Sequence, residues 1–485
     1  MILRWCGVPV VPSAGSACMD FPFVRVCVLA LLLTACSMPS RPDLARMYRV
    51  ASVSPDETPV ILIPGLFGSK LRRRSTGVEV WPGTWERILF DDYSDLALDF
   101  DPATLQARAD DLEAFDIAEA VLGKDFYRPI VDMLVRFGGY ERATPGMRPK
   151  KGQRLYYLFP YDWRQDNVEQ AKGLERLIDT IREDYGDPEL RVDIVAHSMG
   201  GLVARYYLRF GPVDVLDGNP SLITLYGAQR VRKLILLGTP NFGAVSALHA
   251  YIEGEPIGFR RMLPELLATM PSGYQLFPHP LADWLINAKG EALADDLFDA
   301  ATWQRYGWSV FDPAAAARID ARYGADGEAR RFALQRYFAF RLERARRFLW
   351  MLSTPEPATP IRYVLFGGDC ALTPARIALE DESGVLRTRL HAADVADRTA
   401  AAALEQVMLE PGDGRVTKPS LLARGTLDPT APQHEESVMP IAYFFFLCEE
   451  HDQLTGNINF QDNLLNVLLT RNLPWEETGV PADGR

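Results

Sequence analysis

The feature that most constrains how this chain can fold is the regular alternation of strand-like and helix-like segments between residues 60 and 243. Strands that alternate with helices predict a mostly parallel sheet with helices on both faces. Right-handed connections then bring the carboxyl ends of the strands to one edge of the sheet, where ligands bind. Short apolar segments typical of buried strands cover 60–70, 154–164, 190–198 and 231–243, and segments with helical spacing of apolar residues cover 126–140, 171–186 and 201–211.

The alternation stops after residue 244 and resumes near residue 361. The intervening stretch is rich in alanine, arginine and aromatic residues and mostly helical in pattern, which predicts a helical cap inserted into the core. Strands are expected again in 361–370 and 439–454, before a closing helix over 459–473. We therefore expect a core of 59–244 and 359–473, a cap of 245–358 and a tail of 474–485.

Two segments have less definite patterns. Residues 91–116 are rich in aspartate and glutamate without a clear period, and we interpret them as an exposed excursion. The cap segment 328–353 combines aromatic residues with arginines. Such a helix could contact anionic lipid, or its aromatic stripe could pack onto the core, and the pattern alone does not separate these alternatives.

The bulk composition describes an acidic globular protein. The chain has 485 residues, 48% of them hydrophobic, a formal net charge of -12 and a pI of about 5.2. This length and apolar content suffice for a large buried core. The acidic balance argues against nucleic-acid binding.

The N-terminal region has the pattern of an export signal. The apolar run "VCVLALLLTA" (26–35) follows Arg25, and its length is too short to span a bilayer. "LTAC" (33–36) resembles the lipobox of bacterial lipoproteins, which implies removal of 1–35 and attachment of lipid to Cys36. The alternative is an ordinary cleaved signal with an incidental cysteine.

Export has consequences for location and for the other cysteines. Ser37 follows Cys36, in place of the aspartate associated with inner-membrane retention, so we expect an outer-membrane lipoprotein or a periplasmic protein. The polar, proline-containing stretch 36–58 is predicted to be a tether. Cys370 and Cys448, at the ends of the last two predicted strands, could form a disulfide in an oxidising compartment. Whether translation starts at Met1 or at Met19 stays open.

The segment "VDIVAHSMGG" (192–201) predicts a catalytic serine. A strand that turns at once into a helix lifts the turn residue, Ser198, above the sheet edge. The usual pattern is G-x-S-x-G, and Ala196 stands at the first glycine. Alanine is small enough for the crowded turn. The N–H groups of Met199, at the helix start, and Leu66, in the loop after the first strand, are candidate donors to an oxyanion.

A serine nucleophile needs a base, and the order of elements selects His451. In a sheet of this kind the base follows the last strand and precedes the last helix, where only His451 stands. His434, in a polar loop before that strand, is the runner-up. His197 adjoins Ser198, but neighbouring side chains at such a turn diverge, so we assign it a structural role.

The base in turn needs a carboxylate, and two aspartates compete. Asp369 ends a predicted strand, and Asp413 lies in a tight turn flanked by glycines. Both lie between Ser198 and His451, as the order of α/β-hydrolase triads requires. These arguments leave the choice nearly even.

The chain contains, in this order, the motifs "PVILIPGLFGSKL", "FYRPIVDMLVRFGGY", "LFPYDWR", "AHSMGGLVARYYL", "LLGTPNFG", "GDGRV" and "EEHDQL". Together these motifs resemble the lecithin–cholesterol acyltransferase family, which includes lysosomal phospholipase A2-type enzymes and bacterial relatives. The resemblance implies an α/β-hydrolase fold, and the family's G-D-G-T-V-like turn maps its acid onto Asp413. The sequence departs by Arg415, where threonine is usual, and by lacking the cysteines of an early lid disulfide.

The resemblance also implies a function. Ser198, His451 and Asp413 would form a triad, with Leu66 and Met199 as oxyanion donors, that acts on lipid esters, foremost glycerophospholipids. We expect no metal and no other cofactor. The partners would be the lipid substrate and a membrane surface reached through the lipid anchor. A general carboxylesterase acting on small or neutral esters is the alternative, and a non-catalytic binding lipoprotein on a hydrolase scaffold is a third hypothesis.

Overall fold

The computed structural model describes residues 41–49, 57–108, 110–121, 124–218, 223–355, 361, 363–395, 397–425 and 437–470. The chain divides into two units, Met1–Asp43 and Leu44–Arg485, and the second contains the sheet and the site discussed below. The predicted signal peptide, Cys36, His434 and the predicted tail lie outside the described residues.

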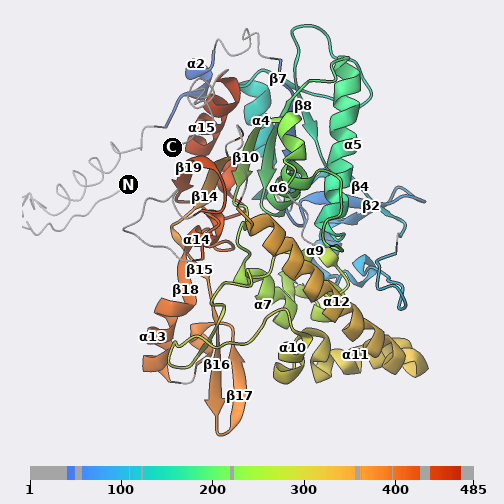
Figure 1. Ribbon diagram of the computed structural model, residues 1–485, viewed down its shortest axis with the longest axis vertical. Coiled ribbons are helices and arrows are strands. Elements are labelled where there is room, and N and C mark those ends of the chain that lie inside the picture. Colours follow the sequence, from blue (N-terminus) through green and yellow to red (C-terminus); the bar gives the residue numbers. More distant parts are fainter. Residues whose placement is uncertain are drawn as a thin grey trace, which may run out of the picture. The chain divides into compact units, whose positions relative to one another are not determined.

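A seven-stranded sheet forms the centre of the larger unit (Figure 1). All neighbouring strands within it pair in parallel, which confirms the predicted fold class. The strands, in their order across the sheet, are β19 (Ile441–Leu447), β14 (Tyr363–Gly368), β10 (Val231–Leu237), β9 (Val192–His197), β1 (Val60–Ile63), β8 (Arg154–Leu158) and β7 (Tyr140–Arg142).

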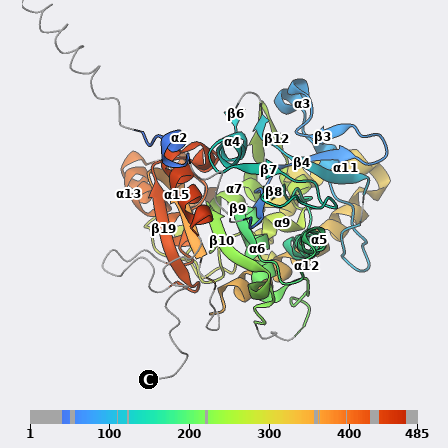
Figure 2. The same ribbon diagram turned by 90° about the horizontal axis from the view of Figure 1, so that it is seen from above.

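Helices cover both faces of this sheet, as Figure 2 shows. Because successive side chains of a strand point to opposite faces, Ile61 and Ile63 of β1 belong to one hydrophobic cluster and Val60 and Leu62 to another. The first cluster includes residues of α5 (Asn167–Tyr185) and α6 (Met199–Phe210), and the second includes residues of α4 (Arg128–Arg136) and α15 (Ile458–Leu469).

The region after β1 is more structured than the sequence suggested. A small antiparallel sheet joins β2 (Ser69–Arg73) to β3 (Glu79–Trp81) and β4 (Leu112–Ile117). The interpretation of 91–116 as an exposed excursion is wrong, because Leu96 and Phe100 are buried and belong to the main core. The remaining elements here are α3 (Trp85–Phe90), the 3₁₀ turn Ser94–Leu96, β5 (Ala120–Val121) and β6 (Lys124–Asp125).

The chain between β10 and β14 is largely helical and includes one hairpin. Its long helix α12 (Gly327–Ser353) buries Tyr337, Phe338 and Phe348, while Phe332 and Trp350 are exposed. Packing onto the core therefore accounts for most of its aromatic residues. The other elements are α7 (Val245–Glu253), β11 (Glu255–Ile257), β12 (Arg260–Met262), α8 (Pro264–Leu267), α9 (Pro271–Tyr274), β13 (Leu285–Asn287), α10 (Ala300–Tyr306) and α11 (Pro313–Tyr323).

Between β14 and β19 the chain forms short strands that the sequence pattern did not indicate. β15 (Ala371–Pro374) pairs with β18 (Leu409–Gly412), and β16 (Ile377–Glu382) pairs with β17 (Val385–Arg389). The helices of this region are α13 (Arg398–Met408) and α14 (Lys418–Leu421). Cys370 and Cys448, at the ends of β14 and β19, form a disulfide, as predicted.

Part of the segment predicted as a tether is folded against the core. Residues Leu44–Met47 form the short helix α2, and Leu44 is buried. The hydroxyl of Tyr48 donates to Asp462 of α15 at 2.8 Å. An apolar contact and a hydrogen bond hold this segment in place. Among the described residues, no helix is long and apolar enough to cross a membrane.

Candidate active site

Ser198 stands at the sharp turn between β9 and α6, with backbone angles φ 52° and ψ -126°. A positive φ is strained for a residue other than glycine, and such strain concentrates at functional sites. The turn is crowded, because a Cβ on Gly200 would lie 2.4 Å from the carbonyl oxygen of Pro64. Ala196 is fully buried within β9. The small residues that the sequence places around the serine are thus those that the turn requires.

A chain of hydrogen bonds links Ser198 to His451 and Asp413. Nε2 of His451 lies 2.9 Å from Oγ of Ser198, and Nδ1 of His451 lies 2.8 Å from Oδ2 of Asp413. His451 lies in the loop between β19 and α15, and Asp413 directly follows β18. An ionised Asp413 accepts the Nδ1–H, which leaves Nε2 free to accept the serine proton. The structure therefore brings together the three residues that the sequence analysis selected.

The surroundings of Asp413 keep it ionised. Its side chain is 2% exposed, and Oδ1 accepts hydrogen bonds from the backbone N–H groups of Val416 at 2.7 Å and Arg415 at 3.0 Å. Burial acts to raise the pKa of Asp413, but the attraction of His451 and these hydrogen bonds outweigh it, so the pKa lies below its ordinary value. A negative Asp413 can both orient His451 and stabilise its protonated form.

The competing aspartate, Asp369, has a different partner. Its Oδ2 accepts a hydrogen bond from Nζ of Lys418 at 2.9 Å, in an ion pair. Asp413 instead shares two contacts with His451, since its backbone carbonyl also accepts from the His451 N–H at 2.8 Å. Geometry thus favours Asp413 over Asp369 as the partner of the base.

The two expected oxyanion donors lie beside Ser198. Met199 follows it at the start of α6, and Leu66 follows Gly65, where an added Cβ would lie 2.7 Å from Cβ of Ser198. Within the described part of the chain, neither the Leu66 N–H nor the Met199 N–H donates a hydrogen bond. Two unengaged backbone N–H groups beside a serine, one of them at a helix start, suit a developing negative charge.

His197 is held in a second chain of hydrogen bonds behind the serine. Its Nε2 lies 3.2 Å from the carbonyl oxygen of His451, and its Nδ1 lies 2.8 Å from the hydroxyl of Tyr127. The Tyr127 hydroxyl also accepts from the Gly65 N–H at 2.8 Å. Burial lowers the pKa of His197 to about 3, so the ring stays neutral. A carbonyl can only accept, so Nε2 carries the proton and Nδ1 accepts from Tyr127. These bonds agree with a structural role.

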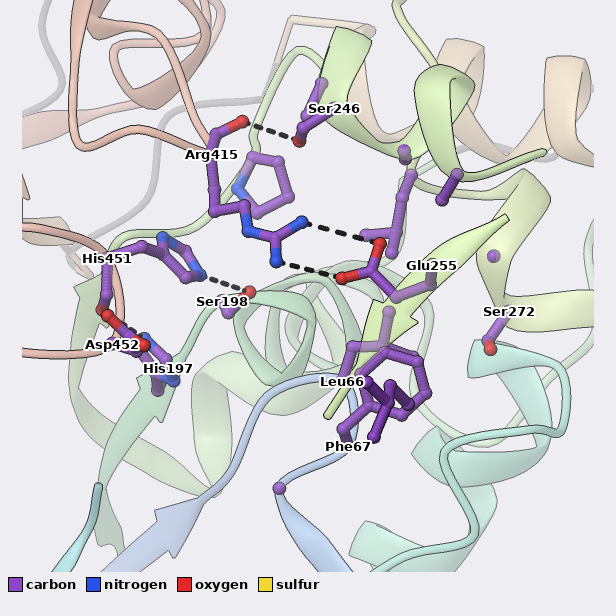
Figure 3. A pocket seen from close by; sticks show the side chains of 18 of the residues that line it. Leu66, Phe67, His197, Ser198, Ser246, Glu255, Ser272, Arg415, His451 and Asp452 are labelled. Carbon is purple, nitrogen blue, oxygen red and sulfur yellow. Dashed lines mark hydrogen bonds and ion pairs between the residues drawn. The ribbon is translucent and has the colours of Figure 1, made fainter. Parts of the chain in front are cut away.

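Ser198 opens into a pocket of about 610 Å³. A volume of this size suits a small molecule or part of a lipid chain. In Figure 3, Arg415 and Glu255 lie above Ser198 in the view, and Leu66 and Phe67 lie below it. The lining is mostly apolar, and it includes Trp81, Pro82, Ile88, Tyr93, Phe126, Tyr127, Tyr251, Ile257, Leu267, Met270, Leu276 and Val416. The described residues contain no group of three or more His, Cys, Asp or Glu side chains that could hold a metal.

Several pocket residues were not anticipated from the sequence. Tyr127 lies in a segment predicted to be a helix, and Glu255 lies in the predicted cap. Arg415 was identified only as a departure from a family pattern. Their roles depend on contacts with residues more than 60 positions away. No periodicity or local motif marks such contacts.

Parts of the chain are similar in sequence to known proteins. The family model described as lecithin:cholesterol acyltransferase matches residues 85–305. The bovine (Bos taurus) lysosomal phospholipase A and acyltransferase is 28% identical over 147 residues, which are 30% of this chain and 30% of that protein. Lecithin-cholesterol acyltransferase-like 4 of Arabidopsis thaliana is 27% identical over 269 residues, 48% of this chain and 45% of that protein. The matched region thus spans less than half the length of each relative.

A solved structure supports the fold. The crystal structure of the Tle4–Tli4 complex aligns with a TM-score of 0.53 at 15% identity, covering 85% of this chain and 98% of that chain. The parallel sheet with its serine turn has the arrangement of the α/β-hydrolase fold. The sequence matches make the chain a distant homologue of proteins of the lecithin:cholesterol acyltransferase family.

Proposed function

We propose that this protein is a serine acyl-ester hydrolase or acyltransferase that acts on lipid esters, foremost glycerophospholipids. The observation that carries the proposal is the hydrogen-bonded chain from Ser198 through His451 to Asp413, which opens into an apolar pocket. The names of the two relatives, a phospholipase and acyltransferase and an acyltransferase-like protein, support the same class.

In the first half of the reaction, Oγ of Ser198 attacks the ester carbonyl carbon. Nε2 of His451 takes the hydroxyl proton as the new Oγ–C bond forms, and Asp413 stabilises the resulting imidazolium. The carbonyl oxygen becomes negative, and the N–H groups of Leu66 and Met199 are placed to donate to it. Each such donor contributes about 3 kcal/mol to transition-state stabilisation.

In the second half, the intermediate collapses to an acyl-enzyme. The bond from carbon to the leaving alcohol oxygen breaks, and His451 returns the proton to that oxygen. Water or an acceptor alcohol then enters, gives its proton to His451 and attacks the acyl carbon. Collapse of this second intermediate releases an acid or a new ester and restores Ser198.

The lining of the pocket favours lipid esters over small polar ones. Its volume of about 610 Å³ and its many aliphatic and aromatic side chains suit an acyl chain, which gains roughly 0.8 kcal/mol for each CH₂ removed from water. A general carboxylesterase is the alternative, and relative rates on short-chain and long-chain esters separate the two. A preference for p-nitrophenyl acetate over p-nitrophenyl decanoate would favour the carboxylesterase.

The proposal is tested with Ser198→Ala. We expect this variant to keep its circular dichroism spectrum while losing ester hydrolysis by about four orders of magnitude. A fluorophosphonate probe should label the wild-type serine and leave the variant unlabelled. Ser353→Ala is a matched control, because Ser353 also contacts a histidine, His279 Nε2 at 2.7 Å, but lies outside the pocket. Turnover retained by Ser198→Ala, or lost equally in Ser353→Ala, contradicts the assignment.

We also propose that the protein is exported and anchored to a membrane through lipid on Cys36. The supporting pattern is the apolar run 26–35 followed by "LTAC", which lies outside the described residues. Intact-mass analysis of the expressed protein should find cleavage before Cys36 and the mass of attached acyl chains. Cys36→Ser should then move the protein from the membrane fraction to the soluble fraction, and an unchanged distribution would refute the anchor.

A further inference from the structure

One positively charged side chain enters the pocket without a part in the mechanism above. Arg415 follows Asp413 by two residues, and its guanidinium reaches across the pocket beside Ser198 to Glu255 of β11 (Figure 3). Nη2 lies 2.9 Å from Oε1 of Glu255, and Nη1 lies 3.5 Å from Oε2. Among the described residues that line the pocket, Arg415 is the one lysine or arginine.

The main chain of Arg415 is fixed relative to the reacting atoms. Its N–H donates to Oδ1 of Asp413 at 3.0 Å, and its carbonyl oxygen accepts from Oγ of Ser246 at 2.8 Å. Asp413 in turn contacts His451, which contacts Ser198. The guanidinium therefore has a defined position with respect to an ester bound at Ser198.

Glu255 occupies only one edge of the guanidinium. It contacts the terminal Nη1 and Nη2, and no hydrogen bond from Nε is present in the described part of the chain. The edge formed by Nε and Nη2 is one of the pairs of parallel N–H groups with which arginine binds carboxylates and phosphates. The side chain of Arg415 is 51% exposed, whereas the Glu255 side chain is 12% exposed.

The other charges of the pocket leave this edge available to an anion. Asp413 is paired with His451, Asp452 is paired with Lys124, and Glu450, a further carboxylate of the lining, is exposed. Glu255 is paired with Arg415 itself and holds the guanidinium in one orientation. The Arg415–Glu255 ion pair next to a mostly apolar lining contributes little to binding a neutral ester, because such an ester has no anionic group that the guanidinium could bind.

We propose that Arg415 is a specificity-determining residue that binds the phosphate of a glycerophospholipid while its acyl ester lies at Ser198. Nε–H and Nη2–H would donate to two phosphate oxygens, with Glu255 as the positioning partner on the opposite edge. This inference rests on the proposed function and names the chemical group by which the site selects its substrate. A contrasting possibility is that Arg415 only ties the cap to the turn of Asp413, and the test separates the two.

The test compares two substrates with the same acyl chains, one with and one without phosphate. Dioctanoyl glycerophosphocholine and dioctanoylglycerol are presented in detergent mixed micelles, and kcat/KM is measured for each. In Arg415→Gln we expect the ratio of phospholipid to diacylglycerol activity to fall by about tenfold or more, because a charged bidentate contact is removed. The ratio for Arg415→Lys should lie between those of wild type and Arg415→Gln, since lysine keeps the positive charge but lacks the pair of parallel N–H groups.

A matched control variant is Arg318→Gln. Arg318 forms a similar pair with Glu265, at 2.5 and 2.9 Å, and neither residue lines the pocket. Its substrate ratio should equal that of wild type. An unchanged ratio in Arg415→Gln overturns the proposal, and an equal loss on both substrates shows instead that Arg415 is a structural tie.

A binding measurement keeps the question separate from catalysis. A dialkyl ether analogue of the phospholipid has no ester to cleave, so it is titrated against wild type and Arg415→Gln with tryptophan fluorescence as the readout. Binding of the ether phospholipid should weaken about tenfold in Arg415→Gln. Binding of the matching dialkylglycerol, which has no phosphate, should be the same in wild type and variant. If wild type cleaves no ester at all, the proposed function fails, and equal binding of the ether phospholipid by both proteins would refute the role of Arg415.

Discussion

The hydroxyl of Tyr127 lies 2.8 Å from Nδ1 of His197, and this contact links the two sides of the candidate active site. On one side the same hydroxyl accepts from the Gly65 N–H, in the loop that precedes Leu66. On the other, His197 donates from Nε2 to the carbonyl oxygen of His451. The position of a proposed oxyanion donor and the position of the proposed base are thus connected through one buried histidine.

Tyr127→Phe breaks this link, so we expect it to lower both stability and activity. The change leaves the Gly65 N–H and His197 Nδ1 without a partner, and unsatisfied buried polar groups cost about 1–3 kcal/mol. We expect urea unfolding to show a loss in this range, and kcat/KM to fall by about tenfold as Leu66 and His451 shift.

Tyr157→Phe is the matched control for this prediction. Tyr157 is also buried, but its hydroxyl has no hydrogen-bond partner among the described residues. Removing that hydroxyl should leave the free energy of unfolding unchanged or slightly higher, because nothing is left unpaired. Equal losses in the two variants would show that removal of a buried hydroxyl itself, and not the hydrogen bonds of Tyr127, causes the effect.

The choice of acid is tested by comparing Asp413→Asn with Asp369→Asn. An asparagine at 413 cannot stabilise the protonated His451 and favours the wrong tautomer, so kcat should fall by about 10²–10⁴-fold. An asparagine at 369 loses only the ion pair with Lys418 and should reduce kcat by less than about threefold. A larger loss at 369 than at 413 would overturn the assignment.

The sequence predicted the parts of the fold that depend on local pattern. The strands β1, β9, β10, β14 and β19 all fall within segments selected by their apolar character. Short strands such as β15 and β18 were missed, because four residues carry too little periodicity to identify a strand whose paired residues lie 35 to 41 positions away in the chain.

The candidate site shows the same limit. The order of elements along the chain was enough to select Ser198 and His451. It could not separate Asp413 from Asp369, since the position at a strand end favoured Asp369 and the glycine-flanked turn favoured Asp413. The physical difference lies in a tertiary contact, the ion pair of Asp369 with Lys418. The role of Glu255 could likewise not be predicted from the sequence, because its partner Arg415 lies 160 residues away.

The disulfide between Cys370 and Cys448 is predicted to support the site as well as the fold. Cys370 directly precedes β15, which pairs with the strand leading to Asp413, and Cys448 lies shortly before His451. Closing a loop across a separation of 78 residues contributes about 4 kcal/mol in the chain-entropy model. The double variant Cys370→Ser/Cys448→Ser should unfold at lower urea concentration by an amount approaching this value and lose activity at lower temperature. An unchanged unfolding midpoint would contradict the prediction.

We expect the protein to lose stability in mild acid, because it contains three buried histidines whose pKa values are lowered. Burial lowers the pKa of His197 to about 3, and the pKa values of His249 and His279 to about 4. In the unfolded chain each titrates near 6.5. As the pH falls below 6.5, the unfolded chain therefore binds protons that the folded protein does not, so the free energy of unfolding decreases. Stability from this source is complete above about pH 6.5 and is lost between there and pH 4.

The magnitude makes this testable. Each histidine contributes a slope of up to about 1.4 kcal/mol per pH unit, and three together up to about 4. Urea unfolding between pH 7.5 and 5 should show this decline, and replacing His249 with leucine should reduce the slope by about a third. His249 is a suitable site because its buried Nε2 has no hydrogen-bond partner in the described part of the chain, so its removal leaves no other group unpaired. A slope as steep in His249→Leu as in wild type would show that other groups cause the acid sensitivity.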